Sequence, residues 1–214
     1  YEYSKQVLHY ATARKLPLVY ASSASVYGAG REFRVSEDCE RPINVYAFSK
    51  PMFDRHVRQL TATFRAPVIG LRYFNVYGPG EAHKGKMASV IHHFNEQLKT
   101  GDELRLFAGS DGYADGGQLR DFVHVDDIVA VNLWAMERGK SGIFNVGTGQ
   151  ARSFNDVANA VLKWHGRGRI SYIPFPAQLQ GSYQSYTQAD FSGLRAAGYT
   201  AEFMPVEKGV PAYL

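Results

Sequence analysis

Two residues in this 214-residue sequence have the types and the spacing needed to move protons. Tyr46 and Lys50 are four positions apart, so on a helix both side chains lie on one face. A phenol has an ordinary pKa of about 10, and lowering it to near 7 takes roughly 4 kcal/mol of preferential stabilisation of the phenolate. An ammonium one turn away and the positive charge of an oxidised nicotinamide together supply such stabilisation. Tyr46 would then accept a proton from a hydroxyl while hydride leaves the same carbon.

The chain around this pair contains two further segments that favour a ligand site. The segment 22–28 (Ser-Ser-Ala-Ser-Val-Tyr-Gly) follows an apolar strand, and 72–79 (Arg-Tyr-Phe-Asn-Val-Tyr-Gly-Pro) ends the next strand along the chain. Open α/β sheets bind ligands at the carboxyl ends of their strands. Ser23 is therefore a candidate hydrogen-bond donor to the oxygen that Tyr46 deprotonates. The alternative is that Tyr46 is plain helix surface and Ser23 a strand-end cap.

The Tyr-x-x-x-Lys pattern is weak by itself. With 14 tyrosines and nine lysines, roughly 0.6 matches are expected by chance. Tyr1 and Lys5 form a second match, but no serine-bearing strand precedes them, so we predict a solvated helix surface there. The interpretation of Tyr46 as a site residue therefore rests on the strands that precede and follow its helix.

Helical and strand-like segments alternate along the chain, which predicts an α/β fold with a largely parallel sheet. The apolar run 16–21 is typical of a strand that is buried on both faces. The other expected strands are 67–73, 104–107, 121–125 and 142–146, and the expected helices are 3–14, 45–64, 87–98, from Asp126 or Asp127 to 137, and 155–165. Ser153 and Asp156 have the spacing of a capping box. Residues 110–118 contain Asp-Gly and Gly-Gly pairs and are predicted to form a loop.

Composition excludes several classes of protein. The net charge of +4 comes from scattered residues, which does not suit nucleic acid, since that requires a basic stripe. No apolar run reaches the ~18 residues of a membrane span. The single cysteine, Cys39, rules out an intramolecular disulfide and fits a cytoplasmic protein. The first residues look neither like a signal peptide nor like a natural start, and we expect both ends to be cut.

The residues quoted above resemble the extended short-chain dehydrogenases/reductases, in the branch of sugar-nucleotide epimerases and dehydratases. Within this branch the sequence is most similar to the ADP-L-glycero-D-manno-heptose 6-epimerases. The similarity includes 75–79 (Asn-Val-Tyr-Gly-Pro), 83–89 (His-Lys-Gly-Lys-Met-Ala-Ser), 142–149, 172–176 and 183–190. The 83–89 stretch is the most specific, because the 4-epimerases of the branch do not share it.

The resemblance implies that bound NADP, or NAD, oxidises C6″ of ADP-D-glycero-D-manno-heptose to a ketone and then returns the hydride to its other face. Such chemistry needs two acid/base groups, which by this match are Tyr46 and Lys84, with Ser23 polarising the carbonyl. Lys50 would orient the nicotinamide ribose, and Val76 would offer its backbone to the nicotinamide. Without the resemblance, Lys84 is equally well explained as an exposed surface lysine.

The resemblance also implies the residues that bind the substrate: Asn75, Lys86, His93, Phe107, Ala108, Gly109, Ser110, Arg120 and Tyr183. Arg120 suits a diphosphate, because a guanidinium pairs bidentately with phosphate oxygens. The alternatives are that Arg120 pairs with Asp121 or Asp126 and that His93 is a helix-face histidine. No metal is expected, and the expected partners are an ADP-heptose and further copies of the chain.

Some features depart from the family pattern. The Gly-rich loop that receives the cofactor pyrophosphate has no match here, so we expect about 90 to 100 residues to be missing and the chain alone to be inactive. Pro51 falls inside the Tyr46 helix and is expected to bend it. Lys86 replaces a small polar residue, and 112–118 looks like an insertion that puts the geometry before Arg120 in doubt.

The expected organisation is interleaved. Residues 1–78 and about 121–148 form the second half of an NAD(P)-binding Rossmann domain, which is the C-terminal part of its parallel sheet. Residues 79–120 and 149–214 form a smaller α/β substrate-binding domain. Two alternative functions remain: another epimerase or dehydratase of the branch, such as a relative of the UDP-glucose 4-epimerases, and a non-catalytic binding domain that kept the fold.

Overall fold

The computed structural model describes residues 1–181 and 183–214, which fall into two compact units. The first unit comprises Tyr1–Phe74, Ile128–Val146 and Ala189–Ala201, and the second comprises Asn75–Asp127, Gly147–Gln188 and Glu202–Leu214. These bounds differ from the expected domains in four places. Residues 75–78, 121–127 and 147–148 lie in the second unit, and 189–201 lies in the first.

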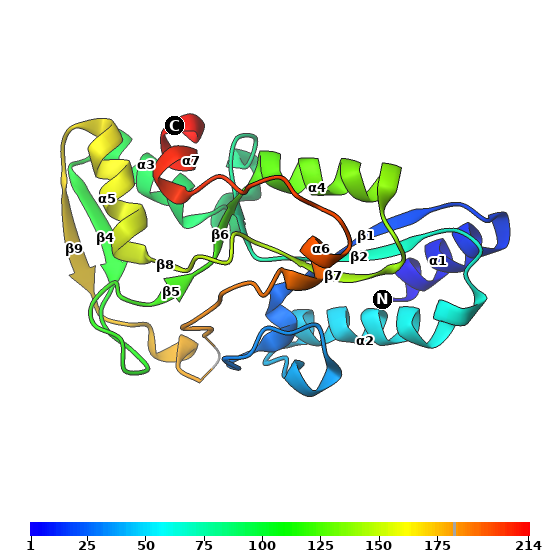
Figure 1. Cartoon of the computed structure of the whole chain (residues 1–214). Coiled ribbons are helices and arrows are strands. Elements are labelled where there is room, and N and C mark those ends of the chain that lie inside the picture. Colours follow the sequence, from blue (N-terminus) through cyan, green and yellow to red (C-terminus); the bar gives the residue numbers. More distant parts are fainter. Residues whose placement is uncertain (182) are drawn as a thin grey trace. The chain divides into compact units, whose positions relative to one another are not determined.

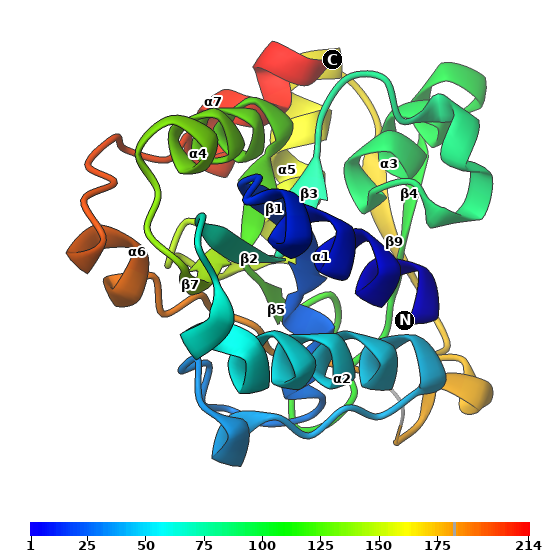
Figure 2. The same ribbon diagram turned by 90° about the vertical axis from the view of Figure 1, so that its right-hand side faces the viewer.

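The first unit is built on a three-stranded parallel sheet in the order β1-β2-β7. Its strands are β1 (Leu18–Ser23), β2 (Val68–Tyr73) and β7 (Gly142–Val146). Its helices are α1 (Glu2–Arg14), α2 (Val45–Leu60), most of α4 (Val125–Arg138) and the short α6 (Ser192–Ala196), with 3₁₀ turns at Ala24–Tyr27, Glu37–Cys39 and Thr61–Thr63. Figures 1 and 2 show α4 on one face of this sheet and α2 on the other. The parallel strands confirm the predicted α/β class.

The order of the strands decides which of them is buried. β2 lies between β1 and β7, and five of its six residues are buried. β1 lies at the end of the order, and of its residues only Ser22 is buried while Ala21 is exposed. The prediction that 16–21 is a strand buried on both faces is therefore wrong, both in its burial and in its bounds of 18–23.

α2 is an unbroken helix through Pro51, and its N-terminus is capped by Asn44, whose side chain accepts a hydrogen bond from the amide of Ala47 at 2.8 Å. A cap of this kind satisfies an amide that otherwise has no partner in the first turn. Pro51 is buried. The cap therefore fixes the first turn of α2, where Tyr46 lies.

A buried ion pair joins α2 to β1 and β2. Asp54 and Arg72 are both 0 % exposed, and the Arg72 guanidinium donates to the Asp54 carboxylate at 2.9 Å. The hydroxyls of Tyr20 and Ser22 in β1 donate to the same carboxylate at 3.0 and 2.9 Å. Asp54 thus receives hydrogen bonds from both neighbouring strands, which fixes α2 against the sheet.

Arg72 extends this network beyond Asp54. It forms an ion pair with Glu40 and donates to the hydroxyl of Tyr27 at 3.0 Å. Tyr27 donates in turn to Asn145 in β7 at 2.6 Å. Burial alone would raise the pKa of Glu40, but its bonds with Arg58 and Arg72 hold that pKa below its ordinary value. Glu40 is therefore ionised at neutral pH and shares the Arg72 charge with Asp54.

The second unit contains three small sheets and three longer helices. The strand pairs are β3–β6 and β4–β9, both parallel, and β5–β8, which is antiparallel. The bounds are β3 (Asn75–Tyr77), α3 (Val90–Thr100), β4 (Glu103–Phe107), β5 (Leu119–Arg120), β6 (Phe122–His124), β8 (Arg152–Ser153), α5 (Phe154–His165), β9 (Arg169–Ile173) and α7 (Val206–Tyr213), with 3₁₀ turns at Ala82–Met87 and Ala177–Leu179. One apolar core fills the unit and takes residues from α3, β4, α5 and α7.

The starts of three expected helices lie in this unit. The predicted capping box is confirmed: the Ser153 hydroxyl accepts from the amide of Asp156, whose carboxylate accepts from the amide of Ser153. The helix expected to begin with a cap at Asp126 or Asp127 instead begins at Val125, which places both acids inside its first turn. Asp127 accepts a hydrogen bond there from the amide of Met204 at 2.8 Å. The helix expected from residue 87 begins at Val90, after Ser89 as its cap.

Replacing Arg72 by methionine is expected to cost about 3–5 kcal/mol of folding free energy, because it leaves Asp54 and Glu40 as buried charges without their cation. Urea denaturation measures this change. Arg55→Met is the control: Arg55 is exposed and lies 3.6 Å from Glu37, so its loss is expected to cost about 0–1 kcal/mol. Equal losses for the two variants would contradict the role given to Arg72.

Candidate functional site

Tyr46 and Lys50 lie in the first two turns of α2 as the spacing predicts. Tyr46 is 59 % exposed, and its hydroxyl has no hydrogen-bond partner in the described part of the chain. The Lys50 ammonium lies 5.5 Å from the centre of the Tyr46 ring. It also donates to the carbonyl of Ala21 in β1 at 3.0 Å. The phenol is therefore free to meet a ligand, while the ammonium is held near the carboxyl end of a strand.

The second Tyr-x-x-x-Lys pair shows why the spacing alone does not identify a site. The Lys5 ammonium lies 5.0 Å from the centre of the Tyr1 ring, close to the geometry of the Tyr46 pair. Lys5, however, is bound to the exposed Glu2 on its own helix at 3.1 Å. What distinguishes Lys50 is its bond to the end of β1.

Ser23 is the last residue of β1 and is half-buried. Its hydroxyl oxygen accepts a hydrogen bond from the amide of Ser25 at 3.2 Å, which caps the 3₁₀ turn that follows. The hydroxyl proton has no acceptor among the residues that the structure describes. Ser23 therefore has the capping role that was expected as the alternative. Its hydroxyl proton is still available to an oxygen of a ligand.

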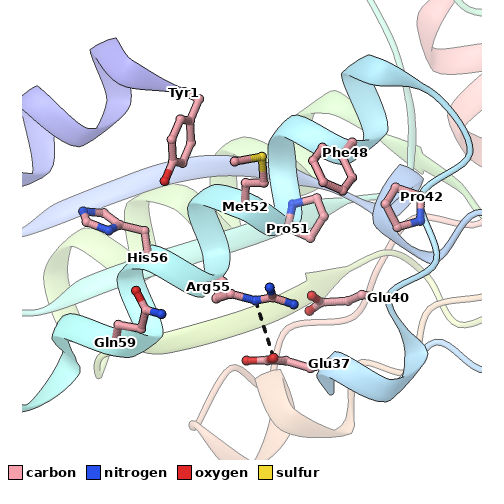
Figure 3. A pocket seen from close by; sticks show the side chains of 10 residues that line it. All are labelled: Tyr1, Glu37, Glu40, Pro42, Phe48, Pro51, Met52, Arg55, His56 and Gln59. Atoms are coloured by element: carbon pink, nitrogen blue, oxygen red, sulfur yellow. Dashed lines mark ion pairs between the residues drawn. The ribbon is translucent and has the colours of Figure 1, made fainter.

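Several hollows lie beside α2 in the described part of the first unit. One has a volume of about 290 Å³ and lies along α2 (Figure 3). Its lining includes Phe48, Met52 and the ion pair of Arg55 with Glu37, but none of the predicted site residues. Another, of about 300 Å³, is lined by Val57 and Arg58 near the end of α2. A smaller one, of about 150 Å³, is lined by Lys50 together with Ser22 and Asp54. Of these three hollows, only the smallest contains a predicted site residue.

In the second unit, Arg120 and Tyr183 are brought together. Arg120 is only 6 % exposed, and its guanidinium lies 4.8 Å from the ring centre of Tyr183 and 5.9 Å from that of Phe154. Its side chain donates to the carbonyl of Leu119 at 3.1 Å and is hydrogen-bonded to Tyr183. Phe175 lies edge-on between Tyr183 and Phe107, with ring centres 5.3 and 5.6 Å away. Three predicted residues thus belong to one cluster.

Arg120 has no acidic partner within ion-pair distance in residues 1–181 and 183–214. The alternative partner Asp121 instead accepts hydrogen bonds from both the amide and the hydroxyl of Thr148 and from the amide of Gly149. Burial lowers the pKa of Arg120, although Tyr183 offsets part of this effect. A buried cation without a counter-charge is a natural binding site for an anion.

The segment 107–110 is held by side chains of the loop 112–118, whose geometry before Arg120 was in doubt. The amide group of Gln118, which is 2 % exposed, donates to the carbonyl of Ala108 at 3.1 Å and to the hydroxyl of Ser110 at 3.0 Å. The amide of Gly109 donates to Asp115 at 2.7 Å. Residues of the loop 112–118 therefore fold back on this segment and fix it.

The remaining predicted residues of the second unit lie apart from the Arg120 cluster. Asn75 is exposed and accepts a hydrogen bond from Thr187 at 3.4 Å, and Val76 pairs with Val123 between β3 and β6. Lys84 and Lys86 are exposed in a 3₁₀ turn, and half-buried His93 packs against His92. No hydrogen bond, ion pair or ring contact joins Lys84, Lys86 or His93 to Arg120 in the part of the chain that the structure describes.

Several residues that shape these groups were not predicted. Asp54, Phe154, Phe175 and Gln118 each contact a candidate residue or its strand. Asp54 follows Lys50 by four positions, so helical spacing alone would have placed it on the same face. The other three are distant in sequence from the residues they contact, and no local pattern marks them.

Within residues 1–181 and 183–214, no three His, Cys, Asp or Glu side chains gather as metal ligands. None of the helices described is both long and apolar enough to cross a membrane.

The chain was compared with known proteins. The family described as the NAD dependent epimerase/dehydratase family matches residues 1–147. The ADP-L-glycero-D-manno-heptose-6-epimerase of Alkalilimnicola ehrlichii is 54 % identical over 215 residues, covering 100 % of this chain and 67 % of the relative.

Solved structures give the same result. The ADP-L-glycero-D-manno-heptose-6-epimerase of Helicobacter pylori is 35 % identical with a TM-score of 0.84, over 100 % of this chain and 63 % of that one. The UDP-glucose 4-epimerase of Thermus thermophilus is 27 % identical with a TM-score of 0.77, over 96 % of this chain and 65 % of that one.

The chain thus spans about two thirds of the length of these relatives. The matched stretch 1–147 includes the strands of the first unit and the helix that carries Tyr46 and Lys50. The chain belongs to the NAD-dependent epimerase/dehydratase family.

Proposed function

We propose that the protein that carries this chain epimerises ADP-D-glycero-D-manno-heptose at C6″, through a transient ketone, to the L-glycero form used in the lipopolysaccharide core. The observation that carries the proposal is the 54 % identity to an ADP-L-glycero-D-manno-heptose-6-epimerase over the whole chain. The geometry of each unit supplies residues suited to one part of this task. A cytoplasmic location and an assembly of several copies stay predictions.

Tyr46 is the proposed acid/base group at C6″. Its hydroxyl is exposed and has no partner in the described residues, and the nearby ammonium of Lys50 favours negative charge on the ring oxygen as a proton leaves. Ser23 would donate its free hydroxyl proton to the substrate oxygen and polarise the carbonyl that forms. Ser23 ends β1, and Lys50 on the helix of Tyr46 is bonded to Ala21 near the same end, where open α/β sheets bind ligands.

The residues near β1 fit the nicotinamide end of a dinucleotide. An ammonium has three donors, and Lys50 uses one of them on the carbonyl of Ala21, which leaves two for the hydroxyls of a ribose. Tyr46 is a further proposed contact of the cofactor in this unit, and the expected contact through the backbone of Val76, in the second unit, stays a prediction. When bound, the nicotinamide supplies reversible hydride transfer, and we propose NADP as the form used.

Lys84 is the proposed second acid/base group. C6 is exocyclic, so rotation about the C5–C6 bond carries its oxygen to a different wall of the pocket, where Tyr46 no longer reaches it. A second proton donor is then required for the opposite face. Lys84 lies in the 83–89 stretch that resembles the 6-epimerases, and its exposed ammonium has three protons to donate.

The Arg120 cluster is proposed to bind the diphosphate of the substrate. The buried guanidinium has no acidic partner in the described residues, and the hydroxyl of Tyr183 is bonded to it. A diphosphate would supply the missing negative charge through short, charge-assisted hydrogen bonds. Lys86, His93, Asn75 and the segment 107–110 would contact other parts of the substrate.

Tyr46→Phe is expected to slow epimerisation by about 10²–10⁴-fold, as is typical for the loss of a general acid/base, with little change in affinity for ADP-heptose. Steady-state kinetics in the protein that carries this chain measures both quantities. Tyr1→Phe is the matched control, because Tyr1 has the same relation to Lys5 without a bond to β1. A Tyr46→Phe variant that turns over like Tyr1→Phe would remove Tyr46 from the mechanism.

Arg120→Met is expected to weaken ADP binding by about 10- to 150-fold, because charge-assisted hydrogen bonds are lost. It should leave stability unchanged or raise it, because an uncompensated buried charge is removed. Calorimetric titration with ADP and urea denaturation test the two effects. Arg152→Met is the control, since Arg152 is bonded to the exposed Glu207 at 2.8 Å. Unchanged ADP affinity combined with strong destabilisation would show a structural role instead.

A further inference from the structure

The loop that carries Lys84 runs from Glu81 to Ser89 in the second unit. Its backbone forms two turns, in which the amide of Lys84 donates to the carbonyl of Glu81 at 2.9 Å and the amide of Ala88 to that of Gly85 at 3.1 Å. Gly85 separates them with φ of 54° and ψ of −126°, a conformation that side chains disfavour. The two turns are therefore joined by the most permissive residue in the loop.

The side chains of residues 82–87, in the middle of the loop, do not hold it in place. Residues 82–87 are all exposed. Their side chains make no hydrogen bond, close ion pair or ring contact with any residue that the structure describes. A segment with few packed groups opens easily, so the order of this loop depends on its ends.

Both ends are joined through the carboxylate of Glu81, which is 3 % exposed. One carboxylate oxygen accepts from the amide of Ser89 at 2.7 Å, and the other accepts from the Ser89 hydroxyl at 2.6 Å. The Ser89 oxygen in turn accepts from the amide of His92 at 3.3 Å and caps α3. One side chain thus closes the loop and fixes it to the start of a helix.

The C-terminal helix α7 supports the same carboxylate. The hydroxyl of Tyr213 is hydrogen-bonded to Glu81 and lies 3.3 Å from Nδ1 of His92. Burial would raise the pKa of Glu81, but the bonds from Ser89 and Tyr213, with the charge of Lys84, hold it below its ordinary value. An ionised carboxylate accepts hydrogen bonds only, which suits its donors here.

We propose that Glu81 is a positioning residue that holds the Lys84 loop in one conformation by joining Ser89 and Tyr213 to the start of the loop. The functional half of this inference rests on the proposed role of Lys84. The structural half, that the carboxylate orders residues 82–89, does not depend on any activity.

Glu81→Gln tests the structural half, because the amide has one oxygen where the carboxylate has two and presents an NH₂ group to the Ser89 hydroxyl. Hydrogen exchange of the backbone amides of residues 82–89 should become about tenfold faster or more, the loss expected for hydrogen bonds to a charged group. The amides of α5 should keep their rates. Glu96→Gln is the matched control, since Glu96 is an exposed glutamate bound to Lys99.

The functional half is tested with an ADP-sugar that has an aldehyde at C6, reduced by a nicotinamide cofactor carrying deuterium. The aldehyde carbon receives deuteride, its oxygen takes a proton from Tyr46 or Lys84, and the cofactor is oxidised. The configuration of the deuterated alcohol, read by NMR, therefore reports which residue donated. Glu81→Gln should shift the ratio of configurations by about 10²-fold toward the one that Lys84→Met gives, since a displacement near 1 Å costs about that much.

The outcomes separate the two claims. Unchanged amide exchange in residues 82–89 of Glu81→Gln overturns the proposal. An unchanged ratio in Glu81→Gln, when Lys84→Met changes it, overturns the functional half alone. An unchanged ratio in Lys84→Met overturns the proposed role of Lys84, while the exchange result still decides the role of Glu81. If Glu81→Gln does not fold, Tyr213→Phe replaces it: faster exchange of the same amides supports the proposal, and unchanged exchange overturns it.

Discussion

The first unit depends on one buried ion pair, between Asp54 of α2 and Arg72 of β2. Each charge is costly to bury, and the pair is tolerated because several neighbouring side chains form hydrogen bonds with both of its members. Tyr20 and Ser22 bind the Asp54 carboxylate, while Glu40 and Tyr27 bind Arg72. The result is a fixed register between α2 and the end of β1.

The register between α2 and β1 positions the residues of α2 that are proposed to take part in the reaction. Lys50 and Asp54 are four residues apart, so one helix face carries both the ammonium bonded to Ala21 and the carboxylate bonded to Ser22. The two bonds are made to consecutive residues of β1, directly before Ser23. A helix anchored at two successive points of a strand cannot slide or rotate without breaking one of them, and Tyr46 on that helix is held with it.

Buried charge is used differently in the second unit. The Arg120 side chain is buried, but its guanidinium contacts aromatic rings instead of an acidic side chain. The two arginines thus represent opposite uses of one side chain: Arg72 is neutralised within the fold, whereas Arg120 has no acidic partner in the described residues and is proposed to bind an anionic ligand. Glu81 is a third case, in which hydrogen-bond donors, with the charge of Lys84, stabilise a buried carboxylate that joins a loop to a helix.

The features that the sequence predicted correctly are set by residues that lie close together in the chain. The capping box at Ser153 and Asp156, the strand at 142–146 and the Tyr46 helix are set by residues within a few positions of each other. The burial of β1 was predicted wrongly because it depends on the strands beside it, which the run 16–21 does not encode. Gln118 reaches back ten positions to Ala108, and Glu81 closes on Ser89; both contacts arise from the path of a loop, which has no periodic pattern to read.

The central claim is that hydride leaves and returns at C6″ of an ADP-heptose, and NMR tests it most directly. The protein that carries this chain is incubated in D₂O with NADP and ADP-D-glycero-D-manno-heptose, and the configuration and isotope at C6″ are followed. The account predicts conversion to the L-glycero form with protium retained at C6″, because the hydride never exchanges with solvent. Deuterium at C6″, or conversion of UDP-glucose to UDP-galactose with no change in the ADP-heptose, would contradict it.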